Sequence, residues 1–174
     1  ISSVPVQAGG FECGDKAVNR LVLNTLWSQR SNFVEVPTDC PQRDERLGWT
    51  GDAQVFAGTA CWLEDSQSFL RKFLRDVMAD QRKDGAIPHF SPDPTRLHPM
   101  SDPTRPDQLA RSGDWAGSTG WGDAIIIIPW QLYLHYGDKG VLAECFPAML
   151  KWLDYLWNIS DGPLIRPSSR RPSR

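Results

Sequence analysis

The chain has 174 residues, of which 40% are hydrophobic and 23% are charged, and its formal net charge is −2. This composition is ordinary for a globular protein, and the length is sufficient for one hydrophobic core. Four arginines lie among the last nine residues, and without them the formal charge is −6, which argues against a nucleic-acid partner.

Metal binding and membrane insertion are not expected either. No two cysteines form a C-x-x-C pair and the three histidines fall in no ligand pattern, so we expect no metal and no cofactor. The longest aliphatic run, Ile125 to Ile128, is too short to span a bilayer, and no signal-peptide pattern is present. Compartment and oligomeric state stay open.

The N-terminal segment and the first helix differ in pattern. Residues 1–14 are rich in Ser, Val and Gly without a helical period, which predicts a linker or the end of a preceding β domain. Since the chain opens without an initiator Met, we expect an N-terminal portion to be missing from it. From Asp15 to Arg30 the apolar residues recur at helical spacing, and Asp15 is the expected N-cap.

A charged stretch without apolar period follows, from Thr38 to Asp52. It contains four acidic residues, two arginines, one Trp, two glycines and one proline. Pro41 disfavours helix, and the glycines on either side of Trp49 permit sharp turns. An irregular charged loop between two helices is a common place for chemistry. The same residues also allow a non-functional interpretation. A loop of mixed charge can be a solvated connection with surface ion pairs. Asp52 can be the N-cap of the next helix, and Trp49 can be a core residue.

A chemical interpretation of this loop is a pocket for glycoside hydrolysis. Its walls would be five side chains: Asp39, Arg43, Glu45, Trp49 and Asp52. One carboxylic acid must stay protonated, and neighbouring carboxylates raise its pKa whereas Arg43 lowers it, so the net shift stays open. The Trp49 ring offers a flat face for the C–H side of a sugar.

Further helices are predicted on both sides of a proline-rich stretch. Apolar stripes predict helices at residues 53–63 and 66–84, with Gly85 as the C′ residue of the second. Residues 87–119 carry six prolines, and a connection this long is usually functional or disordered. Its ends, 87–90 and 114–115, are expected to be ordered.

The C-terminal part is helical up to about Trp157. Asp123 is the expected N-cap of a helix that runs to Tyr136, ends at Gly137 and contains Pro129. Because it is apolar nearly all round, this helix is expected to have neighbours on several sides. A last helix spans residues 139–157, and Pro147 inside it predicts a break near Cys145. Residues 161–174 are rich in Pro, Ser and Arg and predict a disordered tail.

The stretch from Asp39 to Asp52, DCPQRDERLGWTGD, resembles the signature of the α-L-rhamnosidases of glycoside hydrolase family seventy-eight. The resemblance implies an (α/α)6 barrel and inverting cleavage of terminal α-L-rhamnose. It implies that Glu45 is the general acid and that four residues contact rhamnose in the −1 subsite, namely Asp39, Arg43, Trp49 and Asp52. The segment Gly120 to Ala124 resembles the second signature of that family, which adds Trp121, Asp123 and, in reserve, Trp115 as substrate contacts.

The expected fold is therefore all-α, an incomplete (α/α)6 barrel made of about its first half, in residues 15–160. A whole barrel needs on the order of 300 residues. An inverting enzyme also needs a general base, and no residue here matches the family's. We therefore expect a fragment with the general-acid half of the site and little activity alone. The alternatives are a non-catalytic carbohydrate-binding remnant, an (α/α)6 hydrolase of another sugar, and a helical scaffold.

Overall fold

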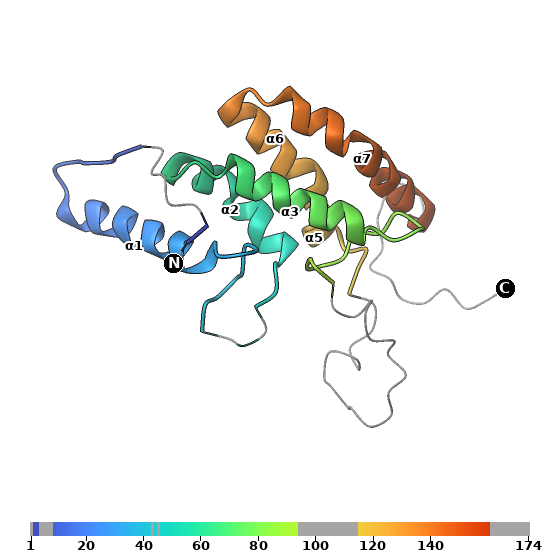
Figure 1. Ribbon diagram of the computed structural model, residues 1–174, viewed down its shortest axis with the longest axis horizontal. Coiled ribbons are helices and arrows are strands. Elements are labelled where there is room, and N and C mark those ends of the chain that lie inside the picture. The colour runs from blue at the N-terminus through green and yellow to red at the C-terminus, as the bar shows by residue number, and fades with distance from the viewer. Residues whose placement is uncertain (1, 4–8, 43, 45, 94–114, 161–174) are drawn as a thin grey trace.

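The computed structural model describes residues 2–3, 9–42, 44, 46–93 and 115–160. These residues form six helices: α1 (Lys16–Asn32), α2 (Thr50–Leu63), α3 (Gln67–Asp80), α5 (Thr119–Gly122), α6 (Ala124–Tyr136) and α7 (Lys139–Ile159) (Figure 1). Within the described ranges the only β pairing is four isolated bridges between connecting segments. The all-α prediction is confirmed for this part of the chain.

Helix α6 lies at the centre of the packing and contacts α2, α3 and α7. Its residues Ile125, Ile128 and Leu132 are fully buried, together with Leu70 and Phe73 of α3. The apolar sequence of α6 predicted several neighbours, and the structure agrees. Pro129 lies inside α6 and Pro147 lies inside α7. Helix α7 runs through Pro147 without interruption, so the predicted break is absent.

Two of the predicted helix ends are wrong, and two are confirmed. Helix α2 begins at Thr50 with Trp49 as its N-cap, so Asp52 lies in the first turn and not before it. Helix α3 ends at Asp80, earlier than predicted, because Gln81 leaves the helix and a turn at residues 82–86 follows. Gly85 stands in that turn with φ +98° and is not the C′ residue of α3. As predicted, the side chain of Asp15 caps α1 and Gly137 ends α6 in the left-handed conformation.

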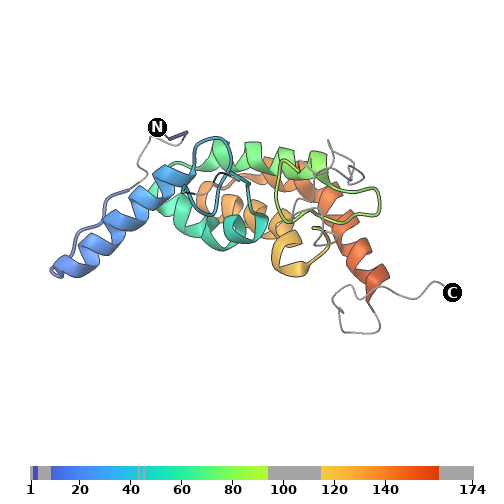
Figure 2. The same cartoon turned by 90° about the horizontal axis from the view of Figure 1, so that it is seen from below.

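Helix α1 is attached to the other helices through its last turns. Its buried residues are Leu26, Gln29 and Asn32, all in the C-terminal half, whereas Leu21 is largely exposed. Figure 2 shows the N-terminal end of α1 projecting away from the other helices. Arg30 Nε donates to the fully buried carboxylate of Glu64 at 2.6 Å, which ties the end of α1 to the end of α2.

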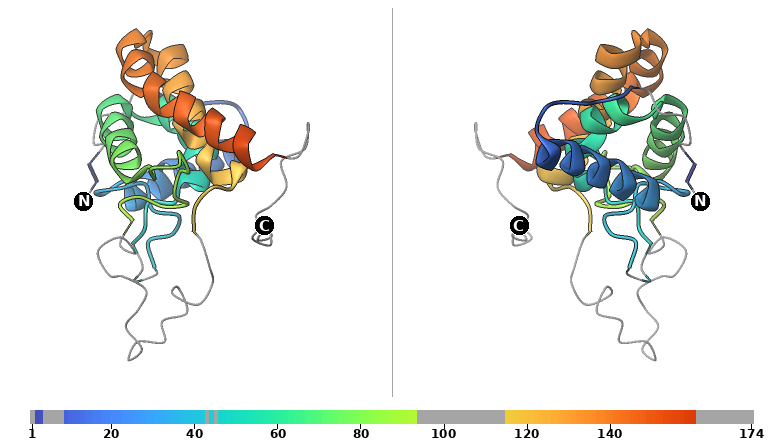
Figure 3. Two further views of the ribbon diagram at one scale, coloured as in Figure 1. Left: turned by 90° about the vertical axis from the view of Figure 1, so that its right-hand side faces the viewer. Right: turned by 90° about the vertical axis from the view of Figure 1, so that its left-hand side faces the viewer.

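Connecting segments gather on one side of the helices, below them in Figure 1 and in both views of Figure 3. Residues 87–90 run between the start of α2 and residues 115–117: His89 O accepts from Thr50 N at 2.9 Å, and His89 N donates to Trp115 O at 2.8 Å. On the same edge Ser91 N donates to Gly48 O at 2.9 Å. The two ends of the proline-rich stretch are thus ordered, as predicted for residues 87–90 and Trp115, while residues 94–114 and 161–174 lie outside the described ranges.

Gly48 is required by this arrangement. A Cβ atom there would overlap the carbonyl oxygen of Ser91 and would lie 2.8 Å from Cε2 of Phe73. The exit of the charged loop is therefore pressed against α3 and the 87–93 segment, which fixes where the next residues, Trp49 and Thr50, begin α2.

Candidate functional site

A pocket of about 490 Å³ lies where the end of α1, the charged loop, the start of α2 and α5 meet. Three of the side chains that the sequence predicted as substrate contacts line it, each from a different element: Asp39 from the loop, Asp52 from α2 and Trp121 from α5. The other lining residues that bear on its chemistry come from α1 (Ser28, Gln29, Asn32) and from the apolar side of α2 (Val55, Phe56).

Asp39 is held in place by the residue before it. Thr38 Oγ1 donates to Asn32 Oδ1 at 2.9 Å, and Thr38 N donates to Asn32 O at 3.3 Å. Asn32 Nδ2 in turn donates to Ser28 O at 2.9 Å. These bonds tie the entry of the loop to the last turn of α1, so the half-buried Asp39 faces the pocket from a defined position.

Asp52 also lines the pocket, from the first turn of α2. Partial removal of water from its carboxyl raises the pKa of Asp52, and the negative charge of Asp39 raises it further, whereas a backbone hydrogen bond at Asp52 lowers it. The net pKa is above the ordinary value. The pocket is therefore lined by two carboxylates that interact electrostatically, and their oxygen atoms can accept hydrogen bonds from hydroxyl groups.

Trp121 closes the pocket on the α5 side and is 37% exposed. His89 stacks on its ring, with the ring centroids 4.9 Å apart and an interplanar angle of 26°. An indole with one face covered and surface left toward a polar pocket offers an apolar platform beside two carboxylates.

Trp49 and Trp115 are placed behind this wall, outside the residues that line the pocket. Their rings meet edge to face at 5.8 Å, and both contact Phe90. Trp49 Nε1 is buried without a hydrogen-bond partner among the described residues. Trp49 is thus half-buried among aromatic rings and is not part of the fully buried core. Its predicted contact to substrate stays a prediction, as does that of Trp115.

Asp123 is engaged by a partner that the sequence did not indicate. Its Oδ1 accepts from Nε1 of the buried Trp152 at 2.9 Å, and its side chain makes no capping bond to α6 although it holds the N-cap position. Asp123 is not among the residues that line the pocket. The predicted capping bond is therefore absent, and the predicted substrate contact stays a prediction.

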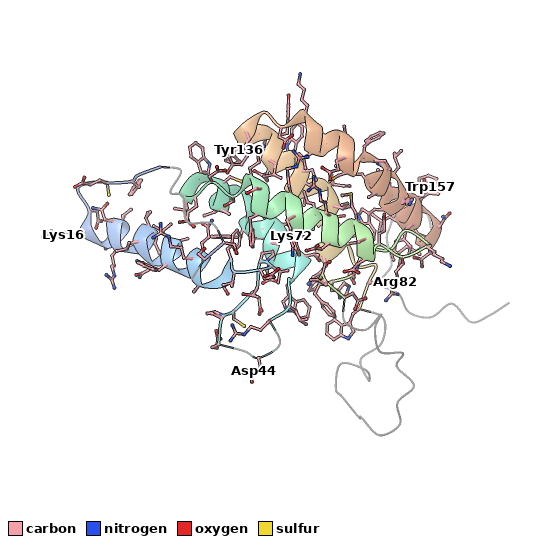
Figure 4. The ribbon with its side chains drawn as sticks, viewed as in Figure 1. Lys16, Asp44, Lys72, Arg82, Tyr136 and Trp157 are labelled. Carbon is pink, nitrogen blue, oxygen red and sulfur yellow. The ribbon has the colours of Figure 1, made fainter. Side chains whose placement is uncertain are left out.

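Two predicted residues, Arg43 and Glu45, lie outside the described ranges. The residue between them, Asp44, is exposed and is seen near the tip of the charged loop (Figure 4). The predicted general-acid role of Glu45 is therefore not addressed by the geometry.

Sequence reasoning missed the contribution of α1 and of His89. The local pattern assigns only a polar position on an amphipathic helix to Ser28, Gln29 and Asn32. It does not indicate that they face a pocket. His89 was expected to be ordered, but its stacking on Trp121 joins residues 32 positions apart. No cluster of side chains able to hold a metal ion is found among the described residues. Nor does any described helix combine the length and hydropathy that crossing a membrane requires.

Comparisons with known proteins agree on one family. Residues 6–170 match the family model described as the bacterial alpha-L-rhamnosidase 6 hairpin glycosidase domain. An alpha-L-rhamnosidase of Streptomyces avermitilis is 44% identical over 158 residues, covering 91% of this chain and 14% of that protein. The crystal structure of the S. avermitilis enzyme complexed with L-rhamnose has a TM-score of 0.81 at 42% identity, covering 96% of this chain and 14% of that one.

A second solved structure leads to the same family. The α-L-rhamnosidase of Dictyoglumus thermophilum has a TM-score of 0.79 at 32% identity, covering 98% of this chain and 18% of that one. The chain thus spans less than a fifth of the length of each of these relatives. A six-hairpin domain fits the predicted incomplete helical barrel, of which this chain provides a part.

Proposed function

Because the chain belongs to the family of bacterial α-L-rhamnosidase six-hairpin glycosidase domains, we propose that it forms part of the sugar-binding site of a protein that hydrolyses α-L-rhamnosides. The observation that carries this proposal is the pocket in which Asp39, Asp52 and Trp121 come together from three elements. A relative of known structure was crystallised with L-rhamnose, which supports a carbohydrate as the ligand.

The pocket chemistry suits one sugar ring. The carboxylates of Asp39 and Asp52 accept hydrogen bonds from sugar hydroxyls, and bonds to a charged acceptor are the stronger kind. The exposed part of the Trp121 indole packs against the C–H face of the ring. Together these groups orient the ring and fix the glycosidic bond relative to the charged loop.

We propose Glu45 as the general acid, on the strength of the resemblance of its loop to the family signature. It would donate its proton to the glycosidic oxygen as the C–O bond breaks, while water attacks the anomeric carbon from the opposite face and inverts its configuration. Such an acid must stay protonated at neutral pH, which a raised pKa provides.

The general base of an inverting reaction must lie about 6.5–9.5 Å from the acid, to leave room for the attacking water. We propose that another part of the longer protein supplies it. The 174-residue chain alone is therefore expected to bind rhamnose without appreciable turnover. Hydrolysis of an aryl α-L-rhamnoside by the isolated chain at the rate of the full-length enzyme would contradict this division.

The role of Glu45 is tested by Glu45→Gln in the full-length enzyme that carries this chain. A general acid contributes roughly 10²- to 10⁴-fold, so kcat/KM for a rhamnoside with an alkyl leaving group should fall by about that factor. A nitrophenyl rhamnoside, whose leaving group needs little protonation, should be affected far less.

The matched control is Asp44→Asn, which removes the neighbouring exposed carboxylate from the same loop. It should leave both substrates nearly unaffected. Equal losses on the two substrates for Glu45→Gln, or near-normal cleavage of the alkyl rhamnoside, would remove Glu45 as the acid. Retained configuration in the released sugar would contradict the inverting course.

A further inference from the structure

Helix α5 is a single turn, yet it carries the indole that forms one wall of the pocket. A four-residue helix has little stability of its own, so its position depends on what holds it. Its C-terminal end is held by Trp152: Nε1 of Trp152 donates to Asp123 Oδ1, and a Cβ atom at Gly122 would overlap the Trp152 ring.

The other end of α5 is held by Gln54 of α2. Its Nε2 donates to the carbonyl oxygen of Gly120 at 2.7 Å, a side-chain bond that joins residues 66 positions apart. The Oε1 atom of Gln54 is buried without a hydrogen-bond partner among the described residues. The side chain therefore makes one strong contact, and that contact is to the backbone of the residue before Trp121.

Close approach between the start of α2 and α5 is also built into the backbone. A Cβ atom at Gly51 would lie 3.0 Å from Gly120 O and 3.0 Å from Cδ1 and Nε1 of Trp121. Those separations are tighter than ordinary van der Waals contact. The edge of the indole thus rests on the first turn of α2, one residue before Asp52.

His89 covers one face of the same indole, and His89 is itself fixed by backbone bonds to Thr50 and Trp115. Thr50 Oγ1 adds a bond to His89 O at 2.9 Å. The indole of Trp121 is therefore bounded by His89 on a face and Gly51 at an edge, and the bond from Gln54 prevents the turn from moving away from both.

We propose that Gln54 is a positioning residue that sets the separation between the Trp121 indole and the carboxylates of Asp39 and Asp52, and so fits the pocket to a single pyranose ring. The inference rests on the proposed function, because it takes Trp121 as a sugar platform. Gln54 does not line the pocket, so its effect on a bound sugar passes through Gly120 and Trp121.

The test uses ¹⁵N-labelled 174-residue chain and the indole N–H resonances of its eight tryptophans. The Trp121 resonance is assigned by its loss in Trp121→Phe. Gln54→Leu removes the bond to Gly120 at nearly constant volume, so the Trp121 resonance should shift or broaden while the resonance of the exposed Trp157 stays in place. This readout requires no bound sugar.

Gln131→Leu is the matched control, because it removes the same amide from α6, where Gln131 neighbours Gly58 and not α5. It should leave the Trp121 resonance unchanged. Gly51→Ala provides a second perturbation from the opposite side: its methyl group should displace the indole even though the Gln54 bond remains possible. Circular dichroism confirms that each variant keeps the helical content of the parent.

L-rhamnose titration then measures the consequence for binding. Loss of one hydrogen bond worth about 0.5–1.5 kcal/mol corresponds to roughly two- to tenfold weaker binding in Gln54→Leu. In the full-length enzyme this should appear mainly as a raised KM for the rhamnoside, with kcat changed less, and Gln131→Leu should change neither.

The outcomes separate the two proposals. An unmoved Trp121 resonance in Gln54→Leu would overturn the positioning role, whatever the sugar does. Normal L-rhamnose affinity in Trp121→Ala, measured in the full-length enzyme, would instead overturn the sugar contact of the proposed function. Weakened binding in Trp121→Ala together with normal binding in Gln54→Leu would keep the sugar contact and reject Gln54.

Discussion

Asp52 shows how one position in a helix changes the behaviour of a side chain. An aspartate before the helix would be an ordinary N-cap, but Asp52 lies in the first turn of α2 and lines the same pocket as Asp39, whose charge helps to raise its pKa. The raised pKa of Asp52 means that the folded chain holds this proton more tightly than the unfolded chain. Ionising Asp52 therefore costs stability in the folded state.

The sign of the pH dependence follows from that raised pKa. Below pH 3.8, the ordinary value, both states are protonated and no penalty exists; as pH rises through the folded-state pKa, stability is lost. Asp52→Asn should therefore raise Tm at pH 7 by about 1 °C, corresponding to roughly a few tenths of a kcal/mol for a carboxyl this exposed to solvent. The difference should vanish near pH 3.

Thermal unfolding followed by circular dichroism between pH 3 and pH 7 measures this difference. Asp154→Asn on the exposed side of α7 is the control and should track the parent throughout. A lower Tm for Asp52→Asn at pH 7 would mean that the carboxylate stabilises the folded state, contrary to the direction of its pKa.

At the residue scale, the sequence identified several residues that line the pocket but not the hydrogen-bond partners of the predicted site residues. Asp39, Asp52 and Trp121 were predicted together and lie around one pocket. Asp123 was predicted with them, but its carboxylate binds the indole of Trp152, because helix α7 returns across the start of α6. A contact between residues 29 positions apart depends on how the helices cross, and no local pattern encodes that.

Helices α1 and α2 are joined by an ion pair whose two members differ in burial. The Glu64 side chain is 0% exposed, whereas that of Arg30 is 25% exposed. The second carboxylate oxygen of Glu64, Oε2, is buried without a hydrogen-bond partner among the described residues. Removing Arg30 should therefore cost more stability than removing the charge of Glu64, because only the guanidinium can turn toward water.

Arg30→Met leaves the buried Glu64 carboxylate without its cation and should cost about 3 kcal/mol. Glu64→Gln keeps a hydrogen-bond acceptor for Arg30 and should cost only about 1 kcal/mol. Urea denaturation of the two variants measures the difference. The double variant should be more stable than Arg30→Met alone; equal losses in the two single variants would refute the asymmetry.

Element boundaries were predicted where a residue acts locally, as Asp15 does through its side-chain cap and Gly137 through its left-handed backbone. They were missed where the end is decided by tertiary contacts. Helix α3 stops at Asp80, whose carboxylate accepts from Ser91 Oγ at 2.7 Å and from Asp93 N at 2.8 Å. Its sequence alone, with an apolar stripe and a following glycine, favoured four more helical residues.

At the scale of the whole molecule, the outstanding feature is apolar surface that nothing in the described structure covers. On α7 the exposed side chains Phe146, Leu150, Leu153 and Trp157 recur at intervals of three and four residues and so share one face of the helix. Trp157, labelled near the end of α7 in Figure 4, is 81% exposed. Faces of this kind normally pack against another helix.

We expect further helices of the six-hairpin domain to cover this face in the longer protein, and we expect the isolated chain to self-associate through it. Sedimentation velocity should show a concentration-dependent increase in mass for the chain. Leu153→Lys with Trp157→Lys should reduce it, because two charges would then lie within the apolar stripe. Lys substitution of the exposed Asn158 is the control, because a residue one position after Trp157 does not share its face of the helix. Unchanged association in the double variant would place the contact elsewhere.

The amphipathic stripes of the sequence were sufficient for the all-α class, whereas the incomplete barrel followed from the family resemblance together with the length. The apolar sequence of helix α6 predicted that it has neighbours on several sides. It did not show that these neighbours are α2, α3 and α7, which comes from the structure. The location of the pocket at the end of α1 was also beyond local patterns.

Only the last turns of α1 are attached to the other helices, so the position of the pocket does not depend on the first turns of that helix. Leu26, Gln29 and Asn32 are buried there, and the bonds between Asn32 and Thr38 carry the loop that ends in Asp39. The first turns bury no side chain and depend on helix propensity and the Asp15 cap. Fraying at that end would leave the pocket wall of this chain undisturbed, so a polar substitution in the first two turns of α1 should not displace Asp39.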